Sequence, residues 1–336
     1  MEKIYIDSTL INTKKRSGHI GKKIINGCVE IQIASERDTI FNNILSIQKE
    51  LGLNTHNQVE AIKISGLINY IQDEITSVTF DSDNRCLSVK GPLELFVEGR
   101  ALYFLSEYMS ECLQASYTNS LLIHAAAVYS KEKDRSYLIL GEKGSGKTTL
   151  SFRLCQELGL SLIGNDLVRI GYDENGELFT KEGIRWFDVR ETAVKADDYM
   201  NKLATILSAK SANSWNNKTR ILPEDHSIET HFEQSKIDKI LNIRIDPYQN
   251  YFSVSPWEGV QRNLILHEKI GRHISGQATP FQDDQGNYLG SLPSINRDKA
   301  SLVRDNIVKC MVNTGITELF GPDSKALATW FKEEVL

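Results

Sequence analysis

The sequence predicts an α/β fold for residues 116–336 and a smaller α+β region for residues 1–115. In the first region, short runs such as KIYID, CVEIQIA, SVTF and CLSVK alternate apolar with polar residues, as strands do. In the second region, apolar strand-like runs are interleaved with a helical segment, which is typical of α/β folds. A glycine-rich motif that joins one of those strands to that helix is the third observation.

Helices are also expected in and directly after the first region. The segment from about Asn57 to Ile75 has a helical appearance, and Pro92 to about Ser116 carries the apolar pattern of a connecting helix. We place the domain boundary at that connecting helix. Residues 1–115 contain no motif that can be assigned to chemistry.

The second region opens with the elements that flank the motif. They are an apolar strand at residues 121–130, a second strand at 136–141, a helix at 148–159 and a third strand region at 160–171. Further along, the stretch from Ser208 to Arg220 is polar and without clear periodicity, which predicts a long loop.

Composition and charge narrow the range of partners. The net charge of -5 and the pI near 5.9 speak against a general affinity for nucleic acid or an anionic membrane. The five cysteines are odd in number, scattered and without a CxxC pair, which predicts reduced core thiols. The sequence shows no signal-peptide core and no run of about 20 apolar residues. We expect a cytoplasmic protein whose partner is a small ligand or another protein, and a homo-oligomer stays open.

The strongest signal is GEKGSGKT, which matches GxxxxGK[ST] between an apolar strand and a helix. Its glycines let backbone N–H groups turn inward toward phosphates, and the helix N-terminus adds its dipole. Lys147 is expected to reach the β and γ phosphates, and the Thr148 hydroxyl to hold magnesium. The expected cofactors are ATP, or another nucleoside triphosphate, and Mg²⁺. The predicted binding residues are Gly141, Glu142, Lys143, Gly144, Ser145, Gly146, Lys147, Thr148 and Thr149.

A carboxylate that holds the metal is expected at the end of a neighbouring strand. Asp166, in LSLIGNDLV, occupies such a place, so Thr148 and Asp166 are the predicted metal ligands. A turn cap is the alternative interpretation of Asp166. The motif by itself does not separate a kinase from an ATPase or a nucleotide switch.

The succession IHAAAV, LILGEKGSGKTT and LIGNDLVRI resembles the catalytic domain of the HPr kinase/phosphorylase family. It also resembles the related kinases that modify lasso-peptide precursors. The resemblance implies a compact P-loop-containing fold akin to phosphoenolpyruvate carboxykinase and transfer of the γ-phosphoryl of ATP to a serine hydroxyl. It covers about Leu121 to the C-terminus, most closely Leu121 to Ile170, and leaves residues 1–115 outside.

The resemblance also implies roles for individual residues. His124 would lie beside the reacting groups, and Asp166 matches the second of two adjacent acids. Where the family has the first acid, this chain has Asn165, whose amide oxygen is far too weakly basic to accept a hydroxyl proton. Asp166 could then serve both metal and proton, neutral His124 could be the base, or the domain could bind nucleotide without transferring phosphate.

Arginines further along complete the predicted site. EGIRWFDVR, with Arg185 and Arg190, and QRNLIL, with Arg262 and Asn263, are similar to segments that the family carries near the phosphates. A guanidinium group binds phosphate oxygens bidentately, although an arginine taken alone is more often a surface residue. The predicted catalytic set is Asp166, His124, Lys147, Asn165, Arg185 and Arg262.

We therefore predict an ATP-dependent kinase that phosphorylates a hydroxyl, with serine on a peptide or protein implied by the resemblance. The alternatives are a small-molecule kinase or ATPase, and a nucleotide-binding regulatory module without phosphoryl transfer. Residues 1–115 are interpreted as a docking module for the acceptor.

Overall fold

The computed structural model describes most of the second region and the regular parts of the first. The described residues are 20–26, 29–35, 64–81, 83–93, 100–190, 193, 197, 199–200, 218–271, 280–282, 287–293 and 298–336. The chain forms two compact units. The first contains residues 1–121 and 271–304, and the second contains residues 122–270 and 305–336. The sequence-based division at residue 115 had placed 271–304 in the second region, whereas the structure groups this segment with the first.

The first unit contains a mixed five-stranded sheet with strand order β1-β2-β3-β5-β4. The central pairs β2–β3 and β3–β5 are parallel, and the outer pairs β1–β2 and β4–β5 are antiparallel. The strands are β1 (Ile20–Asn26), β2 (Val29–Ser35), β3 (Ile64–Gln72), β4 (Ser77–Asp81) and β5 (Cys86–Gly91). Strands β2, β3 and β5 bury residues at every second position, because successive side chains point to opposite faces of a sheet.

Helix α2 (Arg100–Tyr117) packs on strands β2 and β3 and confirms the predicted connecting helix. Gly66 permits the close approach, since a Cβ there would lie 2.3 Å from Met109 Cε. The hairpin of β16 (Pro280–Gln282) and β17 (Tyr288–Ser291) adds Phe281 to the same core, which explains why residues 271–304 join this unit.

The helical interpretation of residues 57–75 is wrong for Ile64–Gln72, which forms β3. In this strand Gly66, Ile68 and Tyr70 are buried and their neighbours are less so, which is the period of two that a strand requires. The remaining part of that prediction before Ile64 lies outside the described residues.

The second unit is built on a sheet that includes nine of the described strands, in the order β6-β10-β11-β14-β8-β7-β9, with β18 and β15 attached beside β14. Its strands are β6 (Ser120–Ile123), β7 (Ala126–Ser130), β8 (Arg135–Leu140), β9 (Ser161–Gly164), β10 (Val168–Tyr172), β11 (Leu178–Gly183), β14 (Ser235–Ile245), β15 (Ser253–Pro256) and β18 (Ile316–Gly321). The long strand β14 runs parallel to both β8 and β18.

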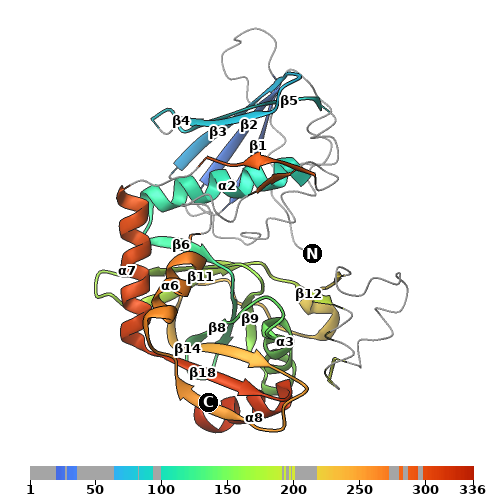
Figure 1. The fold of residues 1–336 in the computed structure, drawn as a ribbon, viewed down its shortest axis with the longest axis vertical. Coiled ribbons are helices and arrows are strands. Elements are labelled where there is room, and N and C mark those ends of the chain that lie inside the picture. The colour runs from blue at the N-terminus through green and yellow to red at the C-terminus, as the bar shows by residue number, and fades with distance from the viewer. Residues whose placement is uncertain are drawn as a thin grey trace. The chain divides into compact units, whose positions relative to one another are not determined.

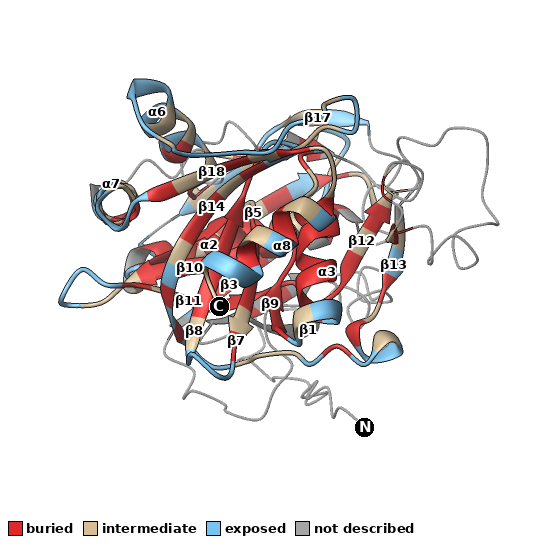
Figure 2. Cartoon of the chain, turned by 90° about the horizontal axis from the view of Figure 1, so that it is seen from below, coloured by how far each residue is buried: buried red, intermediate tan, exposed pale blue. Residues whose placement is uncertain are grey.

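Two helices cover one face of this sheet. Helix α3 (Lys147–Leu158) packs on β7, β8 and β9, and it contacts α8 (Ser324–Glu334), which packs on β18. Figure 2 shows both helices against buried strands. Phe152 and Phe331 are buried beneath them, and Phe331 meets Tyr137 of β8 edge to face at 5.0 Å. This core holds the beginning of α3 at a fixed place on the sheet.

The remaining described elements of the second unit are the pair β12 (Phe187–Arg190) and β13 (Lys218–Ile221), the 3₁₀ turn η4 (Pro223–His226) and α6 (Val260–Lys269). Helix α7 (Asp298–Thr314) contains residues of both units. Figure 1 labels β12, α6 and α7. None of the helices in the described parts of the chain has the length and apolar character needed to cross a bilayer.

The local predictions for this unit hold with three changes. The predicted strand region at residues 160–171 is two strands, β9 and β10, separated at residues 165–167. The predicted strand at residues 121–130 is two strands, β6 and β7, which are separated at His124 and Ala125. The predicted loop 208–220 lies outside the described residues up to 217, and Lys218–Arg220 belong to β13 rather than to a loop. Strand β8 and helix α3 lie where they were predicted, on either side of the glycine-rich segment.

Candidate active site at the start of α3

The glycine-rich loop connects the end of β8 to the start of α3. Gly141 is required there, because a Cβ would lie 2.2 Å from Ser145 Oγ and 2.6 Å from the Ile243 carbonyl oxygen. Gly146 precedes the helix with a φ of 95°, a conformation that glycine adopts without steric cost. The Ile245 N–H donates to the Ser145 carbonyl at 2.9 Å and fastens the loop to β14. The loop is therefore shaped by its glycines and held by the sheet.

Lys147, the first residue of α3, bends back over this loop. Its Nζ donates to the carbonyl oxygens of Gly141 and Glu142, each at 3.0 Å. The side chain is buried although it carries a charge, and it lines the pocket described next. Since an ammonium group has three donor positions, it can bind the loop and still contact an anion in the pocket.

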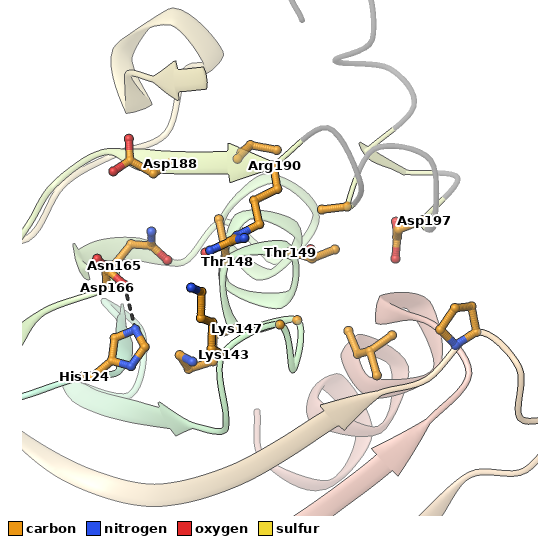
Figure 3. A pocket seen from close by; sticks show the side chains of 16 residues that line it. His124, Lys143, Lys147, Thr148, Thr149, Asn165, Asp166, Asp188, Arg190 and Asp197 are labelled. Atoms are coloured by element: carbon orange, nitrogen blue, oxygen red, sulfur yellow. Dashed lines mark hydrogen bonds and ion pairs between the residues drawn. The ribbon is translucent and has the colours of Figure 1, made fainter. Parts of the chain in front are cut away.

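A pocket of about 250 Å³ opens at the N-terminus of α3. Figure 3 shows its side chains, which come from the loop, α3, the turns after β6 and β9, strand β12 and the end of β14. The lining residues are His124, Lys143, Gly144, Gly146, Lys147, Thr148, Thr149, Asn165, Asp166, Asp188, Val189, Arg190, Ala193, Asp197, Ile245 and Pro247. The backbone amides at a helix N-terminus attract anions, so this pocket is suited to phosphate groups.

His124 and Asp166 form a close pair at one end of the pocket. His124 lies in the break between β6 and β7, and its Nε2 is 2.7 Å from Asp166 Oδ1 (Figure 3). Asp166 follows β9 with a φ of 76°, a region that non-glycine residues adopt rarely and Asp more readily than most. The two residues, 42 positions apart in the sequence, are thus joined by a hydrogen bond.

Asn165 precedes Asp166 and is held by a close crossing of strands. Its N–H donates to the Ile184 carbonyl at 2.7 Å, and a Cβ on the neighbouring Gly164 would lie 2.6 Å from Gly183 Cα. The Asn165 side chain is buried, and its Oδ1 has no hydrogen-bond partner among the described residues. The two glycines therefore let β9 and β11 meet and place Asn165 and Asp166 at the pocket.

Glu142 links the loop to helix α6. Its Oε1 lies 2.7 Å from Lys269 Nζ, which also donates to the Gly141 carbonyl at 3.4 Å. The hydrogen bond from Lys269 holds the pKa of Glu142 below its usual value, burial opposes this, and the charges of Lys269, Lys147 and His124 add to the lowering. Glu142 is thus a carboxylate among cations. Sequence patterns had not pointed to Lys269.

Strand β12 and the segment after it supply another wall, with Asp188, Arg190 and Asp197. Oδ1 of Asp188 is 3.5 Å from Nε of Arg220 on β13, and this ion pair orients the Asp188 carboxylate. Asp197 has a structural role as well, because its Oδ2 accepts a hydrogen bond from the Ser324 N–H at 3.1 Å. Neither aspartate was predicted. Asp188 lies in the arginine-containing segment that was singled out, whereas no motif marks Asp197.

The structure brings together most but not all of the predicted site residues. His124, Lys147, Asn165 and Asp166 line the pocket, as do most of the predicted loop residues. Gly141, Glu142 and Ser145 do not line it. The Gly141 carbonyl accepts hydrogen bonds from Lys147 and Lys269, and Glu142 and Ser145 support the loop.

Two of the predicted arginines lie elsewhere. The Nε of Arg185 donates to the His231 carbonyl at 3.3 Å, and its guanidinium stacks 4.1 Å from the Phe232 ring centroid. Arg262 on α6 donates to the Trp257 carbonyl at 3.1 Å. Neither arginine lines the pocket, whereas Arg190 does.

The chemistry of the donor set fits a hard divalent cation such as Mg²⁺. Thr148 and Asp166 offer a hydroxyl and a carboxylate, which are the oxygen ligands that Mg²⁺ prefers, and phosphate oxygens would complete the set. Within the described residues, no cluster of three or more His, Cys, Asp or Glu side chains forms a preassembled metal site.

No family model matches the sequence, and no curated protein matches it. A solved structure described as the Hpr(Ser) kinase/phosphatase from Coxiella burnetii is similar at 15% sequence identity and a TM-score of 0.22, and the match covers 40% of this chain and 76% of that one. The function proposed next is therefore based on the pocket and the sequence motif.

Proposed function

We propose that the protein is an ATP-dependent kinase that transfers the γ-phosphoryl group to a hydroxyl, with a serine of a peptide or protein as the acceptor. The observation that carries this proposal is the placement of the His124–Asp166 pair and of Lys147 and Thr148 in one pocket at the N-terminus of α3. A phosphate site alone would support binding only. An acid–base pair facing it supports transfer.

The pocket residues would have separate roles in phosphoryl transfer. The loop amides, Lys147 and Arg190 would neutralise the phosphate oxygens, and Thr148 and Asp166 would hold Mg²⁺. Mg²⁺ would supply charge neutralisation on the transferring phosphoryl group. The acceptor oxygen forms a bond to phosphorus while the bond to the ADP leaving oxygen breaks. The acceptor proton passes to the His124–Asp166 pair, because Asn165 is too weakly basic to take it.

Phosphoryl transfer depends mainly on positioning and charge neutralisation, which makes the amide at position 165 tolerable. The same amide favours a second candidate function, a regulatory module that binds nucleotide and transfers nothing. A small-molecule kinase or an ATPase with water as acceptor remains within the same chemistry. The N-terminal unit carries no assigned chemistry, and we propose it as the docking module for a protein or peptide acceptor.

The experiment uses the full chain with Mg²⁺, labelled ATP and a library of serine-containing peptides. Label on a peptide supports the kinase, free phosphate alone supports an ATPase, and binding without turnover supports the regulatory module. Lys147→Ala should abolish nucleotide binding, and Asp166→Asn should lower turnover about 100-fold or more while the fold is kept. Lys131→Ala and Asp225→Asn are matched controls, because both side chains are exposed and lie outside the pocket lining. Failure of wild-type protein to bind ATP would refute the proposal.

A further inference from the structure

Asn165 carries a buried polar group that the fold itself does not use. The residue is 2% exposed, its Oδ1 is inaccessible to solvent, and no donor among the described residues reaches that oxygen. A buried acceptor left without a partner costs about 1–3 kcal/mol. Its main chain is already fixed by the hydrogen bond to Ile184. The amide is therefore not needed to hold the turn.

The position of this amide indicates what it serves. Asn165 lines the pocket beside Asp166, and Figure 3 shows its side chain lying on the side of Thr148. These three side chains together present an amide, a carboxylate and a hydroxyl at one end of the pocket. An unpartnered buried group in an ordinary core would be a defect, whereas one in a binding pocket awaits a ligand.

We propose that Asn165 is a third protein ligand of the divalent cation, and that its amide oxygen, which a rotation of the side chain would expose to the pocket, completes a set with Thr148 and Asp166. This inference rests on the proposed function, since the cation arrives as a complex with nucleotide. Mg²⁺ accepts neutral carbonyl oxygens as well as carboxylates, and it is bound in such sites by few protein ligands plus phosphates. The amide adds an oxygen without adding charge.

The neutral ligand has a consequence for affinity. Asp166 is the one carboxylate of the set, and its Oδ1 is hydrogen bonded to His124. The protein groups therefore offer the cation little negative charge, and the phosphates must supply the rest. We expect weak binding of Mg²⁺ alone and tight binding of Mg²⁺ with nucleotide.

If the Asn165 amide bound phosphate instead of the cation, the Asn165→Asp variant would show the opposite effect. A half-turn about the last side-chain bond exchanges oxygen and amine, so Asn165 can in principle donate to a phosphate oxygen instead. An aspartate at this position would strengthen cation binding but repel phosphate. The sign of the effect of Asn165→Asp therefore separates the two roles.

The test measures binding of β,γ-methylene ATP to the full chain by calorimetry over a range of Mg²⁺ concentrations. Asn165→Ala should raise the Mg²⁺ concentration for half-maximal binding about 10-fold, and Asn165→Asp should lower it. Asp188→Asn, which removes a charge from another wall of the pocket, gives the size of the long-range electrostatic effect for comparison. If Asn165→Ala leaves the Mg²⁺ requirement unchanged, or if Asn165→Asp weakens binding, the inference is wrong.

A second measurement needs no nucleotide. Because the amide oxygen is buried without a partner, Asn165→Ala should leave the melting temperature of the free protein unchanged or raise it. A large fall would assign the residue to folding and overturn the inference. If wild-type protein binds no nucleotide at all, the proposed function is wrong. If wild-type and Asn165→Ala proteins both bind nucleotide with the same Mg²⁺ dependence, only the inference about Asn165 is wrong.

Discussion

Glu142 in the glycine-rich loop and Lys269 at the end of α6 form an ion pair, with Oε1 and Nζ 2.7 Å apart. Lys269 shares the Gly141 carbonyl oxygen with Lys147, so two ammonium groups meet at one point of the loop. Ile270, the next residue, forms an antiparallel bridge with Ile123, which precedes His124. The end of α6 therefore contacts both the loop and the strand that leads to His124.

From this relationship we predict that Lys269→Met weakens binding of a Mg²⁺–nucleotide complex by about threefold, a size typical of an ion pair with one exposed partner. Without Lys269, the Glu142 carboxylate is left as a local negative charge that repels phosphate and attracts Lys147. Glu142→Gln in the same protein should restore most of the loss. Calorimetric titration gives the nucleotide affinities of the single and the double variant, and Lys332→Met on α8 is the control at an exposed lysine. Equal losses in the single and double variants would contradict the idea.

Gly164→Ala should damage the pocket as well as the fold. A Cβ at Gly164 would lie 2.6 Å from Gly183 Cα, which is backbone and does not yield as a side chain would. Overpacking of this kind costs about 1–3 kcal/mol in the free energy of unfolding, and the turn of Asn165 and Asp166 would shift. Urea unfolding and nucleotide binding should both be impaired.

The control for this variant is Gly159→Ala. Gly159 has a φ of 67° and open space around its Cβ position, so only backbone strain of about 1 kcal/mol is expected. Nucleotide binding should survive in this variant. A Gly164→Ala protein that binds nucleotide as well as Gly159→Ala would show that the strand crossing does not position the site.

Arg169 and Glu182 form a fully buried cross-strand ion pair between β10 and β11, with Nε 2.6 Å from Oε1. Arg169→Met should cost about 3–5 kcal/mol in unfolding free energy, because it removes the arginine charge that faces a buried carboxylate. Arg169→Met with Glu182→Leu should recover a large part of that loss. Chemical denaturation of the two single variants and the double variant gives the coupling. A double variant no more stable than Arg169→Met would contradict this account.

Stability should fall at mildly acidic pH because of His231. Burial lowers the pKa of His231, the Arg185 charge adds to this, and Glu233 and Asp134 oppose it. The unfolded state, with a pKa of about 6.5, therefore binds the proton first as pH falls, and protonation favours unfolding. The stability that neutral His231 contributes is complete above the pKa of the unfolded state. It is lost as the pH falls from that value through the lower pKa of the folded state.

His231→Phe is the variant that tests this. The ring of His231 stacks on Tyr129 with centroids 3.7 Å apart, and phenylalanine keeps the stacking but cannot be protonated. Melting temperatures measured between pH 8 and pH 5.5 should therefore decline less in His231→Phe than in wild-type protein. Identical declines would place the acid sensitivity in other groups.

Much of the second unit follows from local sequence. The apolar run before Gly141, the glycines and the helix-forming run after Lys147 each dictate their own conformation, so β8, the loop and α3 lie where they were predicted. The segment 64–72 shows the limit of this approach. Over a short stretch its apolar residues fit both the helical period of 3.6 and the strand period of two. The burial of Gly66, Ile68 and Tyr70 in a sheet shows that the segment is a strand.

The site itself was predictable in part. The motif identified the loop, and the resemblance pointed to His124 and Asp166, which the structure brings within 2.7 Å. The positions of Arg185 and Arg262 could not be inferred, because their contacts with His231, Phe232 and Trp257 come from segments distant along the chain or from local turns without a signature. Lys269, Asp188 and Asp197 escaped notice for the same reason.

The sequence by itself determined the strand, loop and helix around Gly141–Thr148, because glycine conformations and helix N-termini are properties of a few adjacent residues. Only the tertiary structure decided which distant side chains share the pocket. Long-range strand pairing and the contact between Gly164 and Gly183 set those positions, and such contacts depend on the packing of the whole unit rather than on any local pattern.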